Sequence, residues 1–236
     1  MKIFSLTVCL LSFSLIAYTQ TLNIHKNGGT VQSFSLSEID SITFTISSCP
    51  ATVQYEGKTY NTVLIGNQCW LKENLDVGTM IQVNQNASNN SVIEKYCYDN
   101  DPSNCNIYGG LYLWDEVMQY STNEGAQGIC PNGWHLPTKA EFEALITLAN
   151  NSSDGLLEVG QRTGATNSTG FSALLAGHRR DNAVFFPPYY AHFWSSSKFD
   201  GANSYYLLID YPNDGSVSAT SYLPNAFGLQ IRCVKN

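Results

Sequence analysis

Two cysteines far apart in the chain constrain the fold more than any other feature of the sequence. Cys130 comes shortly before a predicted helix, and Cys233 lies in the last predicted strand. In the chain-entropy model, a bond that closes a loop of roughly 100 residues stabilises the folded state by about 4–5 kcal/mol. The placement of these cysteines suggests a single domain that is joined covalently from its first helix to its last strand.

The cysteine count indicates a disulfide framework. Cys9 lies in the apolar N-terminal stretch, which leaves an even set of six in the rest of the chain: Cys49, Cys69, Cys97, Cys105, Cys130 and Cys233. Six cysteines allow fifteen pairings, and the count alone does not choose among them. Zinc is the rival explanation, but the sequence has no CxxC pair and no His-x-His or His-x3-His spacing.

The N-terminus is typical of a secretory signal peptide, assigned to residues 1–19. A basic start, Met1-Lys2, leads into an apolar stretch over 3–17 that is too short to span a bilayer, and small residues precede a cleavage at Gln20. A buried N-terminal strand or helix is the alternative. Cys9 lies inside the apolar stretch rather than at the cleavage site, which argues against a lipid anchor. We therefore expect an exported protein without a membrane span, either secreted, periplasmic or associated with the cell surface.

Composition narrows the choice of partners. Charged residues make up 13% of the chain, about half of the usual share, and the formal net charge is −7. The sequence contains no run of basic residues. Nucleic acids and anionic membranes are therefore poor candidate partners, since both are bound through basic patches.

Residues 20–48 are expected to form a small N-terminal β-hairpin segment. Two short alternating runs flank Asn27-Gly28-Gly29, which is a strong hairpin signal, and a third strand is expected over 41–46. The segment resembles one that is common in exported Bacteroidetes proteins. Within it, Asp40-Ser41-Ile42 resembles the O-glycosylation motif of that phylum.

Residues 49–236 are expected to form the main domain. A hairpin is predicted over 52–65, and a helix begins at Thr138, where a capping box precedes apolar residues at helical spacing. A second helical stretch is predicted near 156–162. The later strands are predicted over 170–176, 192–196, 204–210, 217–220 and 227–234. Helices followed by an antiparallel sheet indicate an α+β fold with two main helices.

Seven ordered segments carry a resemblance to a known family. They are YNTVLIGNQCWLKENL (60–75), YCYDNDPSNC (96–105), YGGLYLW (108–114), CPNGWHLP (130–137), GFSAL (170–174), FWSS (193–196) and FGLQIRCVK (227–235). Through them, residues 53–236 resemble the Fibrobacter succinogenes major paralogous domain, a family of exported bacterial surface proteins. The resemblance implies a C-type-lectin-like fold. It implies no activity, because the biochemical role of the family is unassigned.

The family order, together with the placement described above, implies that Cys130 pairs with Cys233. A bond from Cys97 to Cys105 would close a short polar loop. The remaining pair, Cys49 with Cys69, is assigned partly by elimination.

In a C-type-lectin-like fold the ligand surface is usually the long loop between the second and third strands of the sheet, which here maps to residues 178–191. Polar and charged side chains beside rigid aromatic ones suit the recognition of a sugar or a peptide. The candidate ligand residues are His178, Arg179, Arg180, Asp181, Asn182, Phe185, Phe186, Tyr189 and Tyr190. The alternative is that the aromatic residues only anchor the loop to the core. Trp194 is expected in the core.

Metal and catalytic sites receive less support from the sequence. Asp99, Asp101 and Asn104 place oxygen ligands in one short loop and are weak calcium candidates, but these residue types also form polar turns. No Gly-x-Ser-x-Gly elbow, phosphate-binding loop or catalytic carboxylate pair stands out. Formylglycine-generating enzymes have a related fold and use cysteines or copper, but the cysteines here are expected to be bridged. We expect no cofactor and no enzymatic activity.

The leading hypothesis is therefore an exported binding module that recognises a glycan or a surface protein through the aromatic loop. A structural or adhesive surface component without a discrete ligand site is the second hypothesis. An enzyme is the third.

Overall fold

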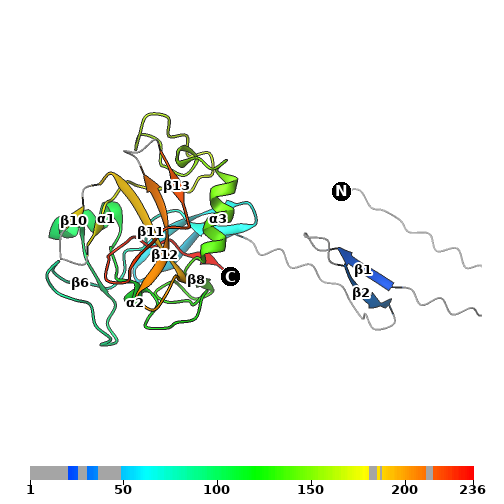
Figure 1. Ribbon diagram of the computed structural model, residues 1–236, viewed down its shortest axis with the longest axis horizontal. Coiled ribbons are helices and arrows are strands. Elements are labelled where there is room, and N and C mark those ends of the chain that lie inside the picture. Colours follow the sequence, from blue (N-terminus) through cyan, green and yellow to red (C-terminus); the bar gives the residue numbers. More distant parts are fainter. Residues whose placement is uncertain (1–20, 26–30, 37–48, 181–184, 187, 211–214) are drawn as a thin grey trace, which may run out of the picture. The chain divides into compact units, whose positions relative to one another are not determined.

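The computed structural model describes residues 21–25, 31–36, 49–180, 185–186, 188–210 and 215–236 (Figure 1). Two compact units meet in sequence between Ser47 and Ser48, one of them reaching from Ser48 to Asn236. The predicted signal peptide, the predicted strand over 41–46 and Asp40-Ser41-Ile42 all lie outside the described residues.

The first unit contains the predicted antiparallel strand pair. Strand β1 (Thr21–His25) pairs with β2 (Val31–Ser35) along its whole length. The Ser33 hydroxyl donates a hydrogen bond to Asn23 Oδ1 at 2.6 Å, across the pair. A two-stranded hairpin of this size has little stability by itself.

The second unit contains a five-stranded sheet in the order β3-β4-β5-β15-β8. Its strands are β3 (Thr52–Tyr55), β4 (Lys58–Ile65), β5 (Gln68–Leu71), β15 (Val234–Lys235) and β8 (Trp134–His135). Glu56 and Gly57 connect β3 to β4 with positive φ angles of 46° and 74°, as a two-residue hairpin turn with the twist of the strands requires. The last strand of the chain lies between β5 and β8, where Val234 is opposite both Trp70 and His135.

A second sheet is built on the long hairpin of β11 (Tyr190–Lys198) and β12 (Asn203–Asp210), with β13 (Val217–Ser218) and β14 (Tyr222–Pro224) both paired to β12. Helix α3 (Lys139–Leu148) packs against β11, β12 and β13 (Figure 1). Because strand residues alternate between faces, Phe193 and Leu207 pack with the apolar side of α3. Trp194 and Tyr206 pack in a separate hydrophobic cluster. Trp194 is fully buried, as expected.

Helix α3 begins as the sequence predicts. Thr138 is its N-cap, and the reciprocal hydrogen bonds between Thr138 and Glu141 form the predicted capping box. The other α-helices of the described residues are α1 (Pro102–Tyr108) and α2 (Trp114–Val117). Short strand pairs complete the fold: β6 (Thr79–Met80) with β7 (Glu94–Lys95), and β9 (His178–Arg179) with β10 (Phe185–Phe186).

Three disulfides connect these elements, and their pairs match those expected from the sequence. The S–S distances are 2.04 Å for Cys49–Cys69, 2.00 Å for Cys97–Cys105 and 2.04 Å for Cys130–Cys233. The last bridge spans 103 residues, and both of its cysteines are fully buried. It ties the segment before α3 to the residue that immediately precedes β15.

The structure differs from the predicted helices in two places. No helix forms near 156–162; Gly160 has a φ of 95°, and the Glu158 amide donates to the Ala173 carbonyl instead of continuing a helical ladder. The stretch predicted as a polar loop before Cys105 instead starts α1, because Asp101 caps the helix and Pro102 occupies its first turn.

The strand predicted over 170–176 is also wrong. Ser172 has a φ of 56°, and apart from an isolated bridge at Ala173 the segment has no ladder. The carbonyls of Phe171 and Ser172 instead accept hydrogen bonds from the buried guanidinium of Arg232. Local alternation of apolar residues gave no sign of this long-range partner.

The class of the fold is mixed and rich in strands, with largely antiparallel sheets, in agreement with the predicted α+β arrangement. None of the helices in the described ranges is long and apolar enough to cross a membrane.

Candidate functional site

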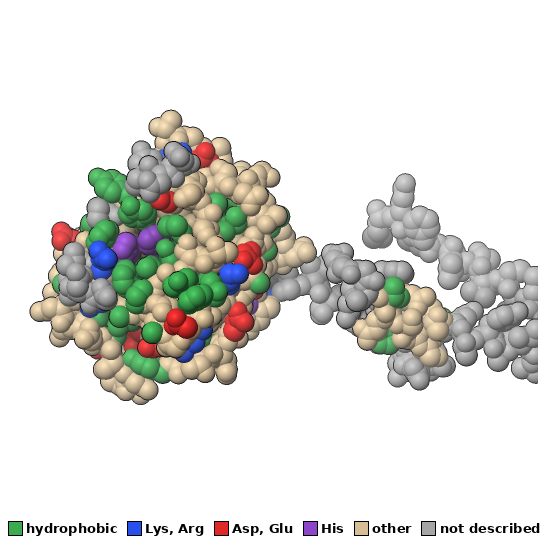
Figure 2. Space-filling view, viewed as in Figure 1, with side chains coloured by type: hydrophobic (Ala, Val, Ile, Leu, Met, Phe, Trp, Pro, Cys, Tyr) green, Lys and Arg blue, Asp and Glu red, His purple; other side chains and the backbone are tan. Residues whose placement is uncertain are grey.

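An aromatic hollow of about 280 Å³ opens at the surface beside the β11–β12 hairpin. Its lining comes from β9, the residue after it, β10, β11, β12, β14 and the segment that leads to the last strand. The residues are His178, Arg180, Phe186, Tyr190, His192, Tyr206, Leu223 and Phe227. Figure 2 shows histidine side chains on this face, surrounded by hydrophobic side chains and with a basic side chain beside them.

Contacts between rings hold the side chains of the lining in place. The ring of His178 stacks on Phe186 with centroids 5.0 Å apart and on Phe227 at 5.9 Å. The His192 ring lies 4.8 Å from His178 and meets Tyr206 edge to face at 5.0 Å. These contacts fix the two histidines side by side in one wall.

The histidines are buried, yet much of their hydrogen-bonding capacity is unused. His178 is 7% exposed and His192 is 5% exposed. In the described part of the chain, His178 Nδ1 and both ring nitrogens of His192 have no hydrogen-bond partner. Buried polar side-chain atoms are hydrogen-bonded in the large majority of cases, so three orphaned nitrogens in one wall require an explanation.

The hollow keeps both histidines neutral. Burial, and then the positive charge of Arg180, lowers the pKa of His178 to about 4. Burial, and then the neighbouring His178, lowers the pKa of His192 well below its ordinary value. A neutral imidazole carries one N–H donor and one acceptor, so His192 has one of each unused, and His178 has Nδ1 unused.

Arg180 lies at the exposed edge of the hollow. Its guanidinium carbon is 4.8 Å from the centre of the Phe186 ring and 5.9 Å from that of Phe227. These cation–π contacts hold the flexible side chain over the aromatic wall. The edge of a stacked guanidinium still presents N–H donors to a ligand.

The structure brings four of the predicted ligand residues to the hollow: His178, Arg180, Phe186 and Tyr190. Tyr189 is 52% exposed and is not part of the lining. Asp181 and Asn182 lie outside the described residues.

Arg179 and Phe185 serve the fold instead of the hollow. Arg179 is 1% exposed, stacks on Tyr96, and donates to the carbonyls of Val83 and Ala226. The Phe185 ring lies 5.4 Å from Tyr98. This contact fits the alternative in which aromatic residues anchor the segment to the body of the domain.

Sequence reasoning missed half of the lining: His192, Tyr206, Leu223 and Phe227. Part of a signal was present, because Tyr190, His192 and Trp194 alternate along β11 and so share one face. The contributions of Tyr206, Leu223 and Phe227 depend on which segments pack around that face, and no local pattern specifies this.

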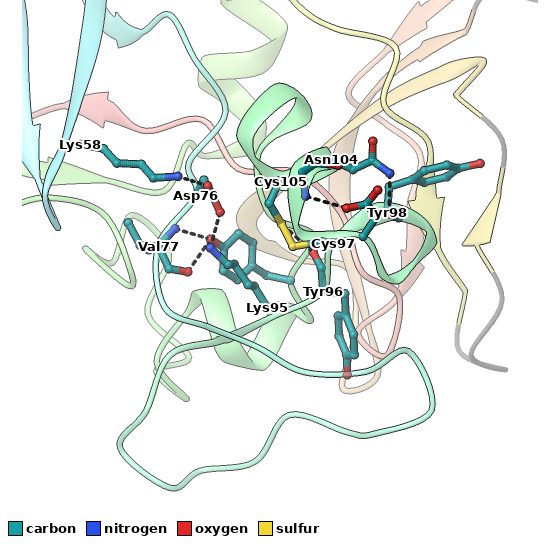
Figure 3. The surroundings of a disulfide bond; sticks show 12 residues. Lys58, Asp76, Val77, Lys95, Tyr96, Cys97, Tyr98, Asn104 and Cys105 are labelled. Carbon is teal, nitrogen blue, oxygen red and sulfur yellow. Dashed lines mark hydrogen bonds and ion pairs between the residues drawn. A yellow bond between two sulfur atoms is a disulfide. The ribbon is translucent and has the colours of Figure 1, made fainter.

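The weak calcium candidates form a capped turn. The Asp101 carboxylate accepts the Ser103 amide at 2.9 Å as the cap of α1, and Asn104 Nδ2 donates to the Tyr98 carbonyl at 2.9 Å (Figure 3). Asp99 has a φ of 56° at the turn that the Cys97–Cys105 bridge closes. No cluster of three or more potential metal ligands occurs among the described residues. The contacts of Asp101 and Asn104 fit the polar-turn interpretation.

A second cavity, of about 380 Å³, lies near the Cys97–Cys105 bridge and has a different character. It is lined by charges of both signs, among them Lys58, Lys72, Glu73, Asp76 and Arg232. Lys58 and Lys95 both pair with the buried Asp76 carboxylate (Figure 3). The guanidinium of Arg232 is fully buried and donates to backbone carbonyls and Asn74 Oδ1. The most buried charged groups of this cavity, Asp76 and Arg232, already have partners within the protein. We therefore interpret their role here as structural.

Comparison with known proteins identifies the family. Searches against curated proteins and against solved structures return no match. The model of the Fibrobacter succinogenes major domain matches residues 63–235, which is most of the second unit. This chain therefore belongs to the Fibrobacter succinogenes major domain family.

Proposed function

We propose that this protein is an exported, non-catalytic binding module that holds a glycan in the aromatic hollow. The observation that carries the proposal is the pair of buried histidines in the lining of the hollow, three of whose ring nitrogens lack hydrogen-bond partners in the described part of the chain. An unpaired buried polar group costs roughly 1–3 kcal/mol. A ligand with several hydroxyl groups can satisfy these nitrogens and recover that cost on binding.

The aromatic residues of the lining suit the apolar C–H face of a sugar ring. Phe186, Phe227 and Tyr206 supply rigid aromatic surface at little entropic cost. A volume of about 280 Å³ is at the small end of ligand sites, which favours one or two sugar units over a long segment of polymer. Insertion of a side chain from a surface protein is the competing way to fill the same hollow.

Export and a C-type-lectin-like fold are part of the same proposal. Three disulfides are typical of a protein that matures in an oxidising compartment. The order of the elements, in which α3 precedes the β11–β12 sheet that it covers, supports the proposed fold.

The test is a glycan array probed with the full, oxidised chain, followed by calorimetry on the glycans that bind. Phe186→Ala removes one stacking wall of the hollow and should weaken binding at least tenfold. Phe199→Ala is the matched control, because Phe199 is an exposed aromatic side chain, 45% accessible, that does not line the hollow. Equal losses in both variants, or no glycan bound by the unmodified protein, would refute the proposal.

A structural or adhesive role is the second candidate, and one observation favours it. Phe199 and Tyr222 are both about half-exposed and stack in parallel at 3.7 Å, so they present a flat aromatic surface to solvent. Under this alternative the glycan array would be empty, and Tyr222→Ala would reduce attachment of the protein to cell surfaces. Phe186→Ala would leave that attachment unchanged.

A further inference from the structure

The hollow has a charge character opposite to that of the chain. The sequence has 19 acidic residues against 12 lysines and arginines. The lining of the hollow nevertheless contains one charged residue, the basic Arg180, beside two neutral histidines, and none of its eight residues is acidic. Asp210 lies on the same sheet, opposite Tyr190 in the β11–β12 register, but it is not part of the lining. The second cavity, in contrast, has Glu73, Asp76 and Glu158 in its wall.

Arg180 is placed to receive an anion. It is exposed, its guanidinium lies over Phe186 and Phe227, and none of the ion pairs among the described residues involves it. Stacking limits the orientations of the side chain, so less entropy is lost when its N–H groups bind a ligand. A guanidinium binds a carboxylate through two parallel hydrogen bonds.

The geometry points to a ligand that is an acidic sugar of the uronate class. This inference rests on the proposed function and adds the charge of the ligand to it. The carboxylate binds Arg180 at the edge of the hollow, the sugar ring stacks on Phe186, and its hydroxyl groups reach His178 and His192 in the wall. The carboxylate then meets a guanidinium that has no ion pair among the described residues, and the hydroxyl groups meet histidines with unpartnered ring nitrogens.

The test compares short oligomers of galacturonate or glucuronate with the same oligomers as methyl esters, in which a methyl group replaces the charge of each carboxylate. Calorimetry on the full, oxidised chain should give at least tenfold tighter binding for the acid, with the difference shrinking as salt is raised because charges are screened. Arg180→Gln should reduce the affinity for the acid to that for the ester. It should lower the affinity for the ester far less, because the ester carries no charge for Arg180 to pair with.

Lys72→Gln is the matched control, because Lys72 is a basic residue of the second cavity. It should preserve the preference for the acid; loss of the preference in this variant instead of in Arg180→Gln would place the acid in the other cavity and overturn the inference. Equal or tighter binding of the ester, or binding of other neutral glycans only, would overturn the inference and leave the proposed function intact. Binding of no saccharide of any kind would overturn both.

Discussion

Replacing His192 with phenylalanine tests whether the hollow keeps unpaired polar groups for a ligand. His192 is 5% exposed, and neither of its ring nitrogens has a hydrogen-bond partner in the described part of the chain. Phenylalanine keeps a ring against Tyr206 but has no polar atom, and its extra volume can extend into the hollow of about 280 Å³. Because an unpaired buried polar group costs roughly 1–3 kcal/mol, we expect the free energy of unfolding to rise by about that amount.

Urea denaturation of the oxidised protein measures this change directly, and thermal unfolding gives a second reading. For a domain of this size, about 1 kcal/mol corresponds to a shift of roughly 2–4 °C in the melting temperature. The same variant should lose glycan binding, because the new ring occupies the site and cannot hydrogen-bond. A gain in stability together with a loss of binding is the signature of a residue kept for function.

The stability difference should also grow as the pH falls. The pKa of His192 is lowered from 6.5 mainly by burial, so below about pH 6.5 the unfolded state binds a proton that the folded state excludes. The free energy of unfolding of the unmodified protein therefore falls as the pH is lowered below about 6.5. His192→Phe removes this contribution, while that of His178, whose pKa is lowered to about 4, remains.

The matched control is His135→Phe. The ring of His135 makes hydrogen-bond contacts with Asn236 Oδ1 at 2.6 Å and with Glu141 at 3.1 Å, so the same substitution should destabilise the protein by about 1–2 kcal/mol. The reasoning fails if His192→Phe lowers the free energy of unfolding by as much as His135→Phe does. That result would mean that His192 contributes polar interactions of its own to the fold.

Three further predictions concern the stability of the fold. The double substitution Cys130→Ser and Cys233→Ser opens the 103-residue loop and should lower the free energy of unfolding by about 4–5 kcal/mol, as measured in urea. Burial opposes protonation of His135, but its hydrogen bonds, first with Glu141, raise its pKa overall. The contribution of protonated His135 to the free energy of unfolding is therefore complete below its ordinary pKa of 6.5, and it is lost as the pH rises through the raised pKa. In His135→Gln, the urea midpoint should not show this decrease between about pH 6 and pH 8.5. In Arg232→Lys, the shorter ammonium group cannot reach all four acceptors of the buried guanidinium, so the free energy of unfolding measured in urea should fall by at least about 2 kcal/mol. A change near zero would mean that these hydrogen bonds do not stabilise the fold.

Elements that depend on neighbouring residues could be predicted from the sequence. The β3–β4 hairpin follows from alternating residues around Glu56-Gly57, and α3 follows from the capping box at Thr138. Both signals describe hydrogen bonds made within a few residues, so the rest of the chain is not needed to interpret them. The local rules failed over 156–162 and 170–176, where backbone groups bond to distant segments.

In the candidate site, too, the sequence predicted what depends on neighbouring residues and not what depends on contacts between distant segments. The sequence correctly pointed to residues 178–191 as a segment that combines polar and aromatic side chains. It could not separate Arg180, which lies over the aromatic wall, from Arg179, the last residue of β9, which is buried against backbone carbonyls. Which of two adjacent arginines reaches the hollow depends on how distant segments pack around them.

By itself, the sequence determined the family, the main hairpins and the start of α3, because each is carried by residue types at fixed spacing along the chain. The cysteine pairs, which the structure contains, followed from the resemblance to the family, from the placement of the cysteines and partly from elimination. Only the tertiary structure decided that His178 and His192 share one wall, that Tyr206, Leu223 and Phe227 complete it, and that no acidic side chain is among the described residues of the lining. The reason is physical: a hollow and an unpaired buried nitrogen are defined by what the surrounding segments leave uncovered, and that is settled only when segments distant in sequence pack together.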